Sequence, residues 1–377
     1  MAQRSIAAVF MRGGTSKGLF FHARDLPADQ AQRDAVFLAA IGSPDAYGRQ
    51  LDGMGGGISS LSKVMVASRS ERADADVDYT FGQVAVAEAL VDAGSNCGNL
   101  TSAIGPFAVD EGLIEVADGE ARLRLYNTNS DRIIESRFAV RNGLAVVEGD
   151  FRLSGVSGTG APIRLDFQDP GGAVTGRLLP TGKVTDRLAV PGHGEIEASL
   201  VDAATAAVFV AAADLGLDGT ELPETLEAAP ALLRRLEAIR QAAATAMGLP
   251  ATGQSVPKIG FVAPPAAAAT LVGESLAADA MHIGARMISM GRPHRALPLT
   301  GALCLAVAAR LEGSVVERAA RGQGAGELRV AQPSGIIGLD ARVSKGGEWR
   351  AESVTVTRTA RRLMEGRVLV PESRLAV

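Results

Sequence analysis

The chain has 377 residues and a formal net charge of −4, with 47% hydrophobic and 21% charged residues. This composition excludes wholesale disorder, and the length is enough for a sizeable core divided between two domains. No tract of lysine and arginine and no apolar run of about 20 residues occurs, so we expect neither nucleic acid nor a membrane as a partner.

Two cysteines, Cys97 and Cys304, are present, and no Cys/His cluster has the spacing of a zinc site. A disulfide framework would need more cysteines in a shorter, secreted chain. The first residues, Met1 to Ser5, lead into a strand-like segment and lack the apolar stretch and cleavage site of a signal peptide. We therefore expect a cytoplasmic protein without a metal site.

Apolar runs and their periodicity predict an α+β chain of short strands and few helices. Glycine-rich loops at 11–18 and 52–57 interrupt the first part, residues 77–91 are mixed, and 133–200 is typical of short strands with Gly/Pro turns. In chain order we expect strands 6–10 and 19–22, a helix 29–41, strands 64–66 and 121–126, a helix 223–247, a strand 259–263, a helix from 299 to about 311 and a strand 353–357.

Two stretches share one pattern, which indicates an internal duplication. The run Asn96 to Asn99 opens an apolar segment that ends at 110–113, and Thr300 to Ala302 opens another that ends at 311–313. Strands precede each segment, and an acidic residue followed by glycine ends it. The pattern predicts two similar domains, each with a central helix that begins after a turn of small and polar residues.

The beginnings of these two helices are the first candidates for a binding site. Helix N-termini present N–H groups and a partial positive charge, so two of them facing each other would bind a di- or tricarboxylate. The donor-rich loops 12–18 and 53–60 would add backbone N–H, hydroxyl and ammonium groups. The alternative is that the glycines of these loops only make turns.

Several side chains have both a chemical and a structural interpretation. At a helix N-terminus the Cys97 thiol would act as acid or base, whereas a buried cysteine is inert. Lys63, beside apolar neighbours, would serve as a base, or it would be an ordinary surface lysine. Lys17 is favoured as an anion binder, His294 is a site candidate or a structural histidine, and Cys304 is expected to pack in the core.

The sequence resembles the PrpF family over nearly its whole length. The resemblance lies in the segments Met11 to Gly18, Gly42 to Asp45, Gln50 to Gly56, Ser62-Lys63, Asn96 to Asn99, Ser289 to Gly291 and Thr357 to Gly366. It implies the diaminopimelate-epimerase-like fold, with two pseudo-symmetric domains, each a rolled β-sheet around a central helix. We expect the domains at 1–183, joined by a returning strand at about 360–377, and at 184–359.

The resemblance also implies an isomerase with Lys63 and Cys97 as its catalytic pair and no cofactor. Lys63 would remove an allylic proton, and Lys63 or Cys97 would return it at another carbon, as backbone N–H groups stabilise the anion. The substrate would be a small polycarboxylate. A homodimer is the assembly that a measurement of the protein's size in solution should test. The expected substrate-binding residues are Arg12, Thr15, Ser16, Lys17, Met54, Gly55, Gly56, Ser62, Asn96, Gly98, Asn99, His294, Thr300, Gly301 and Ala302.

Two branches of the family compete for the substrate. The run 297–304 is closer to the 4-oxalomesaconate tautomerases and the loop 45–50 to the 2-methylaconitate cis-trans isomerases, and we favour 4-oxalomesaconate slightly. An amino-acid epimerase of the same fold would need a facing thiol in each domain, which the position of Cys304 disfavours. A non-catalytic accessory protein or an organic-acid binding protein are the remaining alternatives.

Overall fold

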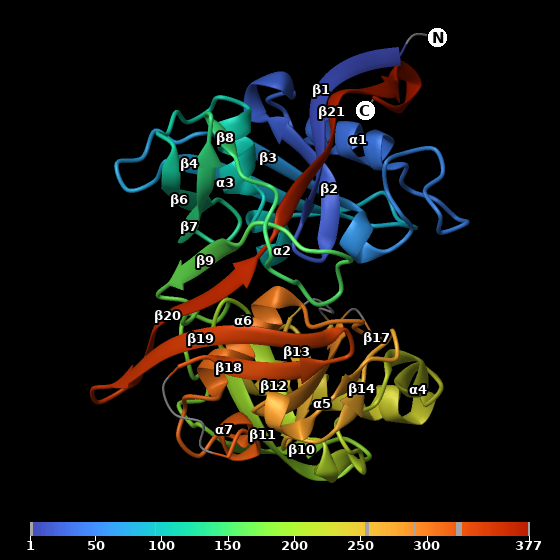
Figure 1. Cartoon of the computed structure of the whole chain (residues 1–377). Helices are drawn as coiled ribbons and strands as arrows, with labels where there is room; N and C mark the ends of the chain where they lie inside the picture. The colour runs from blue at the N-terminus through green and yellow to red at the C-terminus, as the bar shows by residue number, and fades with distance from the viewer. Residues whose placement is uncertain (1–2, 95, 253–255, 290, 322–325, 376–377) are drawn as a thin grey trace. The chain divides into compact units, whose positions relative to one another are not determined.

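A computed structural model describes residues 3–94, 96–252, 256–289, 291–321 and 326–375. Its contacts form two compact units (Figure 1): unit 1 comprises Met1–Leu165 and Thr357–Val377, and unit 2 comprises Asp166–Val356. The chain passes between the units within β9 (Ile163–Gln168) and β20 (Trp349–Arg358), which pair with each other. The boundaries expected from the sequence, after 183 and after 359, lie somewhat later in the chain.

Unit 1 is a mixed sheet with helices on both faces. Its strands lie in the order β21–β1–β2–β3–β4–β6–β7–β9, and β2/β3 and β4/β6 are the parallel pairs. Figure 1 shows the last strand, β21, beside the first, β1. The elements are β1 (Gln3–Gly13), β2 (Ser16–His22), α1 (Gln30–Ile41), β3 (Lys63–Arg69), β4 (Val77–Val84), β5 (Val91–Asp92), α2 (Gly98–Thr101), α3 (Ile104–Asp110), β6 (Gly119–Asn127), β7 (Arg132–Arg141), β8 (Leu144–Ala145) and β21 (Ala360–Pro371).

The two faces of this sheet have different partners. Leu19, Phe21 and Val64 pack with α1 in one core cluster. Side chains alternate along a strand, so their neighbours Phe20 and His22 lie on the opposite face, where their rings contact Phe107 of α3. The pair α2 and α3 contacts β1, β2, β3, β4, β6 and β7 and is buried almost throughout, so it is the central helix of unit 1.

Unit 2 repeats this arrangement. Its strands lie in the order β10–β11–β12–β13–β16–β18–β19–β20, with β12/β13 and β16/β18 parallel, as at the equivalent places in unit 1. Helix α5 packs on one face, and α6, which is fully buried, is the central helix. The elements are β10 (Asp186–Val190), β11 (Gly194–Asp202), β12 (Ala206–Ala211), α4 (Pro223–Glu227), α5 (Pro230–Ala246), β13 (Lys258–Ala263), β14 (Ala268–Ala269), β15 (Ser275–Leu276), β16 (Ile283–Ser289), β17 (Arg292–Pro293), α6 (Leu299–Ala308), α7 (Val315–Ala319), β18 (Leu328–Gln332) and β19 (Gly335–Lys345).

Two of the expected helices are interrupted, and a proline begins or lies in the first turn of the helix that follows each break. The single helix expected over 223–247 is two, because Pro230 begins α5 at a position that needs no N–H. The central segment of unit 1 is likewise divided into α2 and α3. Pro106 has no N–H to donate to the carbonyl of Ser102, so the helical ladder breaks there. In the described part of the chain, no helix is long and apolar enough to cross a membrane.

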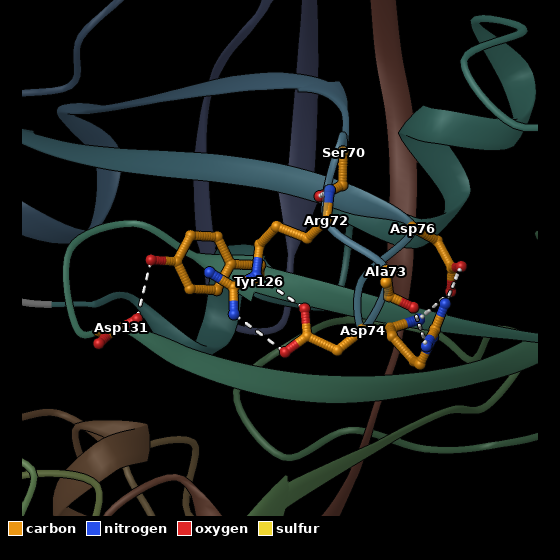
Figure 2. A network of polar contacts seen from close by, with 8 residues as sticks. Ser70, Arg72, Ala73, Asp74, Asp76, Tyr126 and Asp131 are labelled. Carbon is orange, nitrogen blue, oxygen red and sulfur yellow. Dashed lines mark hydrogen bonds and ion pairs between the residues drawn. The ribbon is translucent and has the colours of Figure 1, made fainter.

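A surface network of hydrogen bonds and ion pairs lies beside the first residues of β4. Figure 2 shows the guanidinium of Arg72 over the ring of Tyr126, 4.2 Å from its centroid, with Asp74 accepting hydrogen bonds from Arg72. Beside it, Asp76 accepts a backbone and a side-chain hydrogen bond from Arg124. These contacts join the β3–β4 turn to β6 at the opposite end of β4 from Gln83.

Candidate active site

One face of β4 connects the two residues expected to be catalytic. Tyr79, Phe81 and Gln83 alternate along the strand, so their side chains lie on the same face, within about 14 Å of strand. Phe81 and Gln83 contact Lys63 on the neighbouring strand β3. Tyr79 contacts Asn96 and Thr101, on either side of Cys97. The same face therefore holds Lys63 and the beginning of α2.

Lys63 is the first residue of β3 and is half-buried. Its Nζ lies 2.9 Å from Oε1 of Gln83 and 4.8 Å from the centroid of the Phe81 ring. The Gln83 amide is oriented by its own nitrogen, which donates to the carbonyls of Ser59 and Ser62. These bonds leave the amide oxygen directed at Lys63, so Gln83 holds the amine in place.

Cys97 caps α2 and is only 8% exposed. The preceding Asn96 donates to the hydroxyl of Tyr79, which also contacts Thr101. Burial raises the pKa of Tyr79, so its phenol stays neutral. Gly98, also buried, is the first helical residue, where backbone N–H groups have no partner within a helix.

The β1–β2 turn presses against the beginning of α2, and this contact requires glycine. A Cβ on Gly14 would lie 2.3 Å from Oδ1 of Asn99, and one on Gly13 would lie 2.7 Å from its carbonyl oxygen. Asn99 in turn donates to the hydroxyl of Thr15, 3.1 Å away. At the other end of the loop, a Cβ on Gly18 would lie 2.3 Å from the carbonyl oxygen of Lys63. The hairpin thus touches both sides of the candidate site.

The two charged residues of this hairpin, Arg12 and Lys17, have different surroundings. Arg12 donates to the carbonyls of Gly14 and Thr359, and burial together with Arg361 lowers its pKa. Lys17 lies with Phe10 on the α1 face, its Nζ 5.4 Å from the ring centroid. That face is opposite the one with Lys63. Strand alternation places the neighbouring buried Ser16 on the α2/α3 face.

The second glycine-rich loop is held by α1 and by Gln50. The N–H groups of Met54 and Gly55 donate to the last carbonyls of α1, and Met54 packs in the α1 cluster. The oxygen Oε1 of buried Gln50 accepts from the N–H of Gly57 and from the hydroxyl of Ser62. A Cβ on Gly55 would lie 2.3 Å from this oxygen, and a Cβ on the next residue, Gly56, 2.7 Å from the Leu61 side chain. Ser62 is thereby fixed directly before Lys63.

The remaining predicted residues belong to unit 2. Thr300, Gly301 and Ala302 are buried in the first turn of α6. His294 donates its backbone N–H to Met287, and its Nδ1 accepts from the N–H of Ala296. A Cβ on Gly301 would lie 2.7 Å from Met287 and 3.5 Å from Lys258, which begins β13 as Lys63 begins β3. Met290, of the segment that resembles the family, lies outside the described residues.

Four residues that organise this site were not among the predicted site residues: Tyr79, Phe81, Gln83 and Gln50. The first three alternate through a segment that we described as mixed, and their period of two was the available signal. Gln50, which has a positive φ of 52°, begins a segment that resembles the family, but no role was predicted for its side chain. Among the described residues, no group of three or more His, Cys, Asp and Glu side chains could hold a metal ion.

Comparison with known proteins places the chain among isomerases. It matches the PrpF protein family over residues 3–371. A 2-methyl-aconitate isomerase of Shewanella oneidensis is 40% identical over 389 residues, covering 98% of each chain. A 3-methylitaconate isomerase of Eubacterium barkeri is 38% identical and covers 99% of each. A 4-oxalomesaconate tautomerase of Pseudomonas putida is 38% identical, covering 98% of this chain and 97% of its own.

Solved structures agree in fold. The crystal structure of a methylitaconate-delta-isomerase is 38% identical, has a TM-score of 0.85 and covers 100% of this chain and 98% of its own. A hydroxyproline epimerase of Agrobacterium vitis is 13% identical, has a TM-score of 0.55 and covers 99% and 96%. The prediction of an α+β chain with two epimerase-like domains is confirmed by these likenesses. The chain belongs to the PrpF family and is an isomerase.

Proposed function

We propose that the protein moves a proton and a double bond along a small unsaturated polycarboxylic acid, with Lys63 and Cys97 as the proton-transfer pair. The observation that carries the proposal is the shared face of β4. Gln83 and Phe81 on this face hold Lys63, and Tyr79 on the same face contacts the residues that flank Cys97. An amine on this face, and a thiol whose flanking residues contact the same face, suit a reaction in which one group removes a proton and either group returns it.

The chemistry is balanced within the substrate. Lys63 takes a proton from the carbon next to the double bond, and that C–H electron pair becomes the new double bond. The electrons of the old double bond move toward the conjugated carboxylate, where hydrogen-bond donors stabilise the charge. A proton delivered by Lys63 or Cys97 to the far carbon completes the shift. If the first carbon is reprotonated after rotation, the geometry of the double bond changes instead.

Three acids are candidate substrates, because each occurs in the name of one relative. They are 4-oxalomesaconate, 2-methylaconitate and 3-methylitaconate. All are unsaturated acids with two or more carboxylates, and each has an acidic C–H one bond from the double bond or an enolisable carbonyl. We retain 4-oxalomesaconate as the first to test, with 2-methylaconitate next.

The test is proton NMR of each acid with the enzyme in D₂O. We expect one acid to isomerise quickly and to take up deuterium at the carbons between which the proton moves. Lys63→Ala should slow this by about 100-fold or more, since general-base catalysis contributes about 10²–10⁴. The matched control is Lys17→Ala. The motif predicted Lys17 as an anion binder, but its ammonium lies beside Phe10 on the opposite face of the same sheet, so this variant should retain most of the turnover number. Equal losses in both variants would contradict the assignment of Lys63 as the base.

A further inference from the structure

Arg358, the last residue of β20, is a buried cation with no acidic partner in the part of the chain that the structure describes. Arg358 is 4% exposed, and one of its guanidinium nitrogens donates a hydrogen bond to the carbonyl of the adjacent Thr357. Within the described ranges no carboxylate pairs with it, and its Nε lacks a hydrogen-bond partner.

Such a group is costly for the folded protein. Removing an unpaired cation from water is unfavourable, and burial lowers the pKa of the Arg358 guanidinium to about 9. At neutral pH it therefore still carries its charge. The other deeply buried arginines are satisfied: Arg286 donates to the carbonyls of Glu221, Ala285 and Ala331. Arg240 pairs with Glu237.

The backbone next to Arg358 belongs to the candidate site. The carbonyl of Thr359 accepts hydrogen bonds from the N–H of Gly14 and from the Arg12 guanidinium. Gly14 is the residue packed against Asn99 at the beginning of α2, two residues after Cys97. Arg358 is thus one residue from the strand segment that holds the β1–β2 turn at the central helix.

We propose that Arg358 binds a carboxylate group of the substrate, which supplies the missing counter-charge. The inference rests on the proposed function, because it requires a substrate with at least one carboxylate that takes no part in the proton transfer. A guanidinium presents its donors as a planar fork that matches a carboxylate, and the low-dielectric surroundings strengthen the pair. Arg358 would then contribute to substrate affinity and selection, whereas Lys63 and Cys97 act in the proton transfer.

The experiment compares Arg358→Met with Arg286→Met. Thermal unfolding of the ligand-free proteins reports stability, and calorimetric titration with propane-1,2,3-tricarboxylate, which has no double bond to shift, reports binding. We expect Arg358→Met to unfold at the wild-type temperature or above, because an unpaired charge is removed, and to bind the probe about 10- to 100-fold more weakly. Arg358→Lys should recover part of the affinity. Arg286→Met should unfold at a lower temperature, because three carbonyls lose their donor, yet bind the probe normally.

The outcomes separate the two proposals. If wild-type protein binds the probe and Arg358→Met binds it equally well, the inference about Arg358 is wrong and the proposed function stands. A clear drop in the unfolding temperature of ligand-free Arg358→Met would show that the protein itself satisfies the guanidinium, which also overturns the inference. Failure of the wild-type protein to bind the probe would count against a polycarboxylate substrate and so against both.

Discussion

At the scale of single residues, the glycines of the β1–β2 turn are specified by their neighbours rather than by the turn alone. Their sequence pattern allows two roles, binding an anion or only turning the chain. The contacts give them a third role, because Gly13 and Gly14 allow the hairpin to touch Asn99, and Gly18 allows it to touch Lys63. The loop therefore sets the distance between the hairpin and both candidate catalytic residues.

Gly14→Ala tests this role against a matched glycine. Both Gly14 and Gly112 have positive φ, 52° and 67°, but a Cβ at Gly112 meets nothing within 4 Å. Gly112→Ala should therefore cost only the backbone strain, about 1 kcal/mol of unfolding free energy. Gly14→Ala should cost about 2–4 kcal/mol, because Asn99 must also move, and should lower isomerase turnover. Urea unfolding and initial rates measure both; similar losses in the two variants would contradict the close-packing argument.

At the scale of elements, the strands and helices with a single clear period were predictable and the site strand was not. Helix α1 matches its predicted range, with Asp29 accepting from Gln32 as the N-cap. Strand β4 was missed although Tyr79 and Phe81 alternate along it, because the face that they share ends in the polar Gln83, whose partner lies on another strand. The hydrogen bond from Lys63 to Gln83 spans 20 residues and depends on strand pairing, so no local pattern contains it.

The far end of the central helix carries an ionic cluster that should make unit 1 sensitive to acid. Glu111, after α3, accepts from His22 of β2 and pairs with Arg362 of β21, near Asp110 and Glu365. Burial alone would raise the pKa of Glu111, but the hydrogen bonds from His22 and Arg362 outweigh it and the net pKa is lowered. A lowered carboxylate pKa contributes stability above the ordinary value of about 4.3, and this contribution is lost as pH falls through the lowered value.

Glu111→Gln should therefore destabilise the protein in a pH-dependent way. At pH 7 we expect a loss of about 1–3 kcal/mol, because His22 and Arg362 lose a charged partner inside the fold. Below about pH 4.5 the difference from wild type should shrink as the wild-type carboxylate becomes protonated. Denaturant unfolding from about pH 3.5 to about pH 8, a range that spans the ordinary carboxylate pKa, measures the difference in unfolding free energy between the variant and wild type. The control is Glu120→Gln on the exposed edge of β6, and a pH-independent deficit in Glu111→Gln would contradict the ionic explanation.

At the scale of the whole molecule, the two units share one plan but differ where their central helices begin. The strand neighbours follow the same series of parallel and antiparallel pairs, and Lys63 and Lys258 begin equivalent strands. The duplication was visible in the sequence because both central segments start after a polar turn. The unequal chemistry was visible too, since Cys97 precedes α2 whereas the second thiol lies within α6.

This inequality predicts that only one of the two cysteines takes part in catalysis. Cys304 is 0% exposed, its Sγ lies 3.4 Å from the carbonyl oxygen of Val201, and burial raises its pKa well above the ordinary range. A neutral thiol with its hydrogen bonded inside the core cannot remove a proton from a substrate. Cys304→Ala should therefore keep turnover within about twofold of wild type while losing about 1–2 kcal/mol of stability to the cavity and the lost hydrogen bond.

Cys97→Ala should lower turnover by about 100-fold or more, because a proton-transfer group is removed. Rates by NMR and unfolding by urea on the same samples distinguish the two effects, and a folded Cys304→Ala protein without activity would instead favour the two-thiol chemistry of an epimerase.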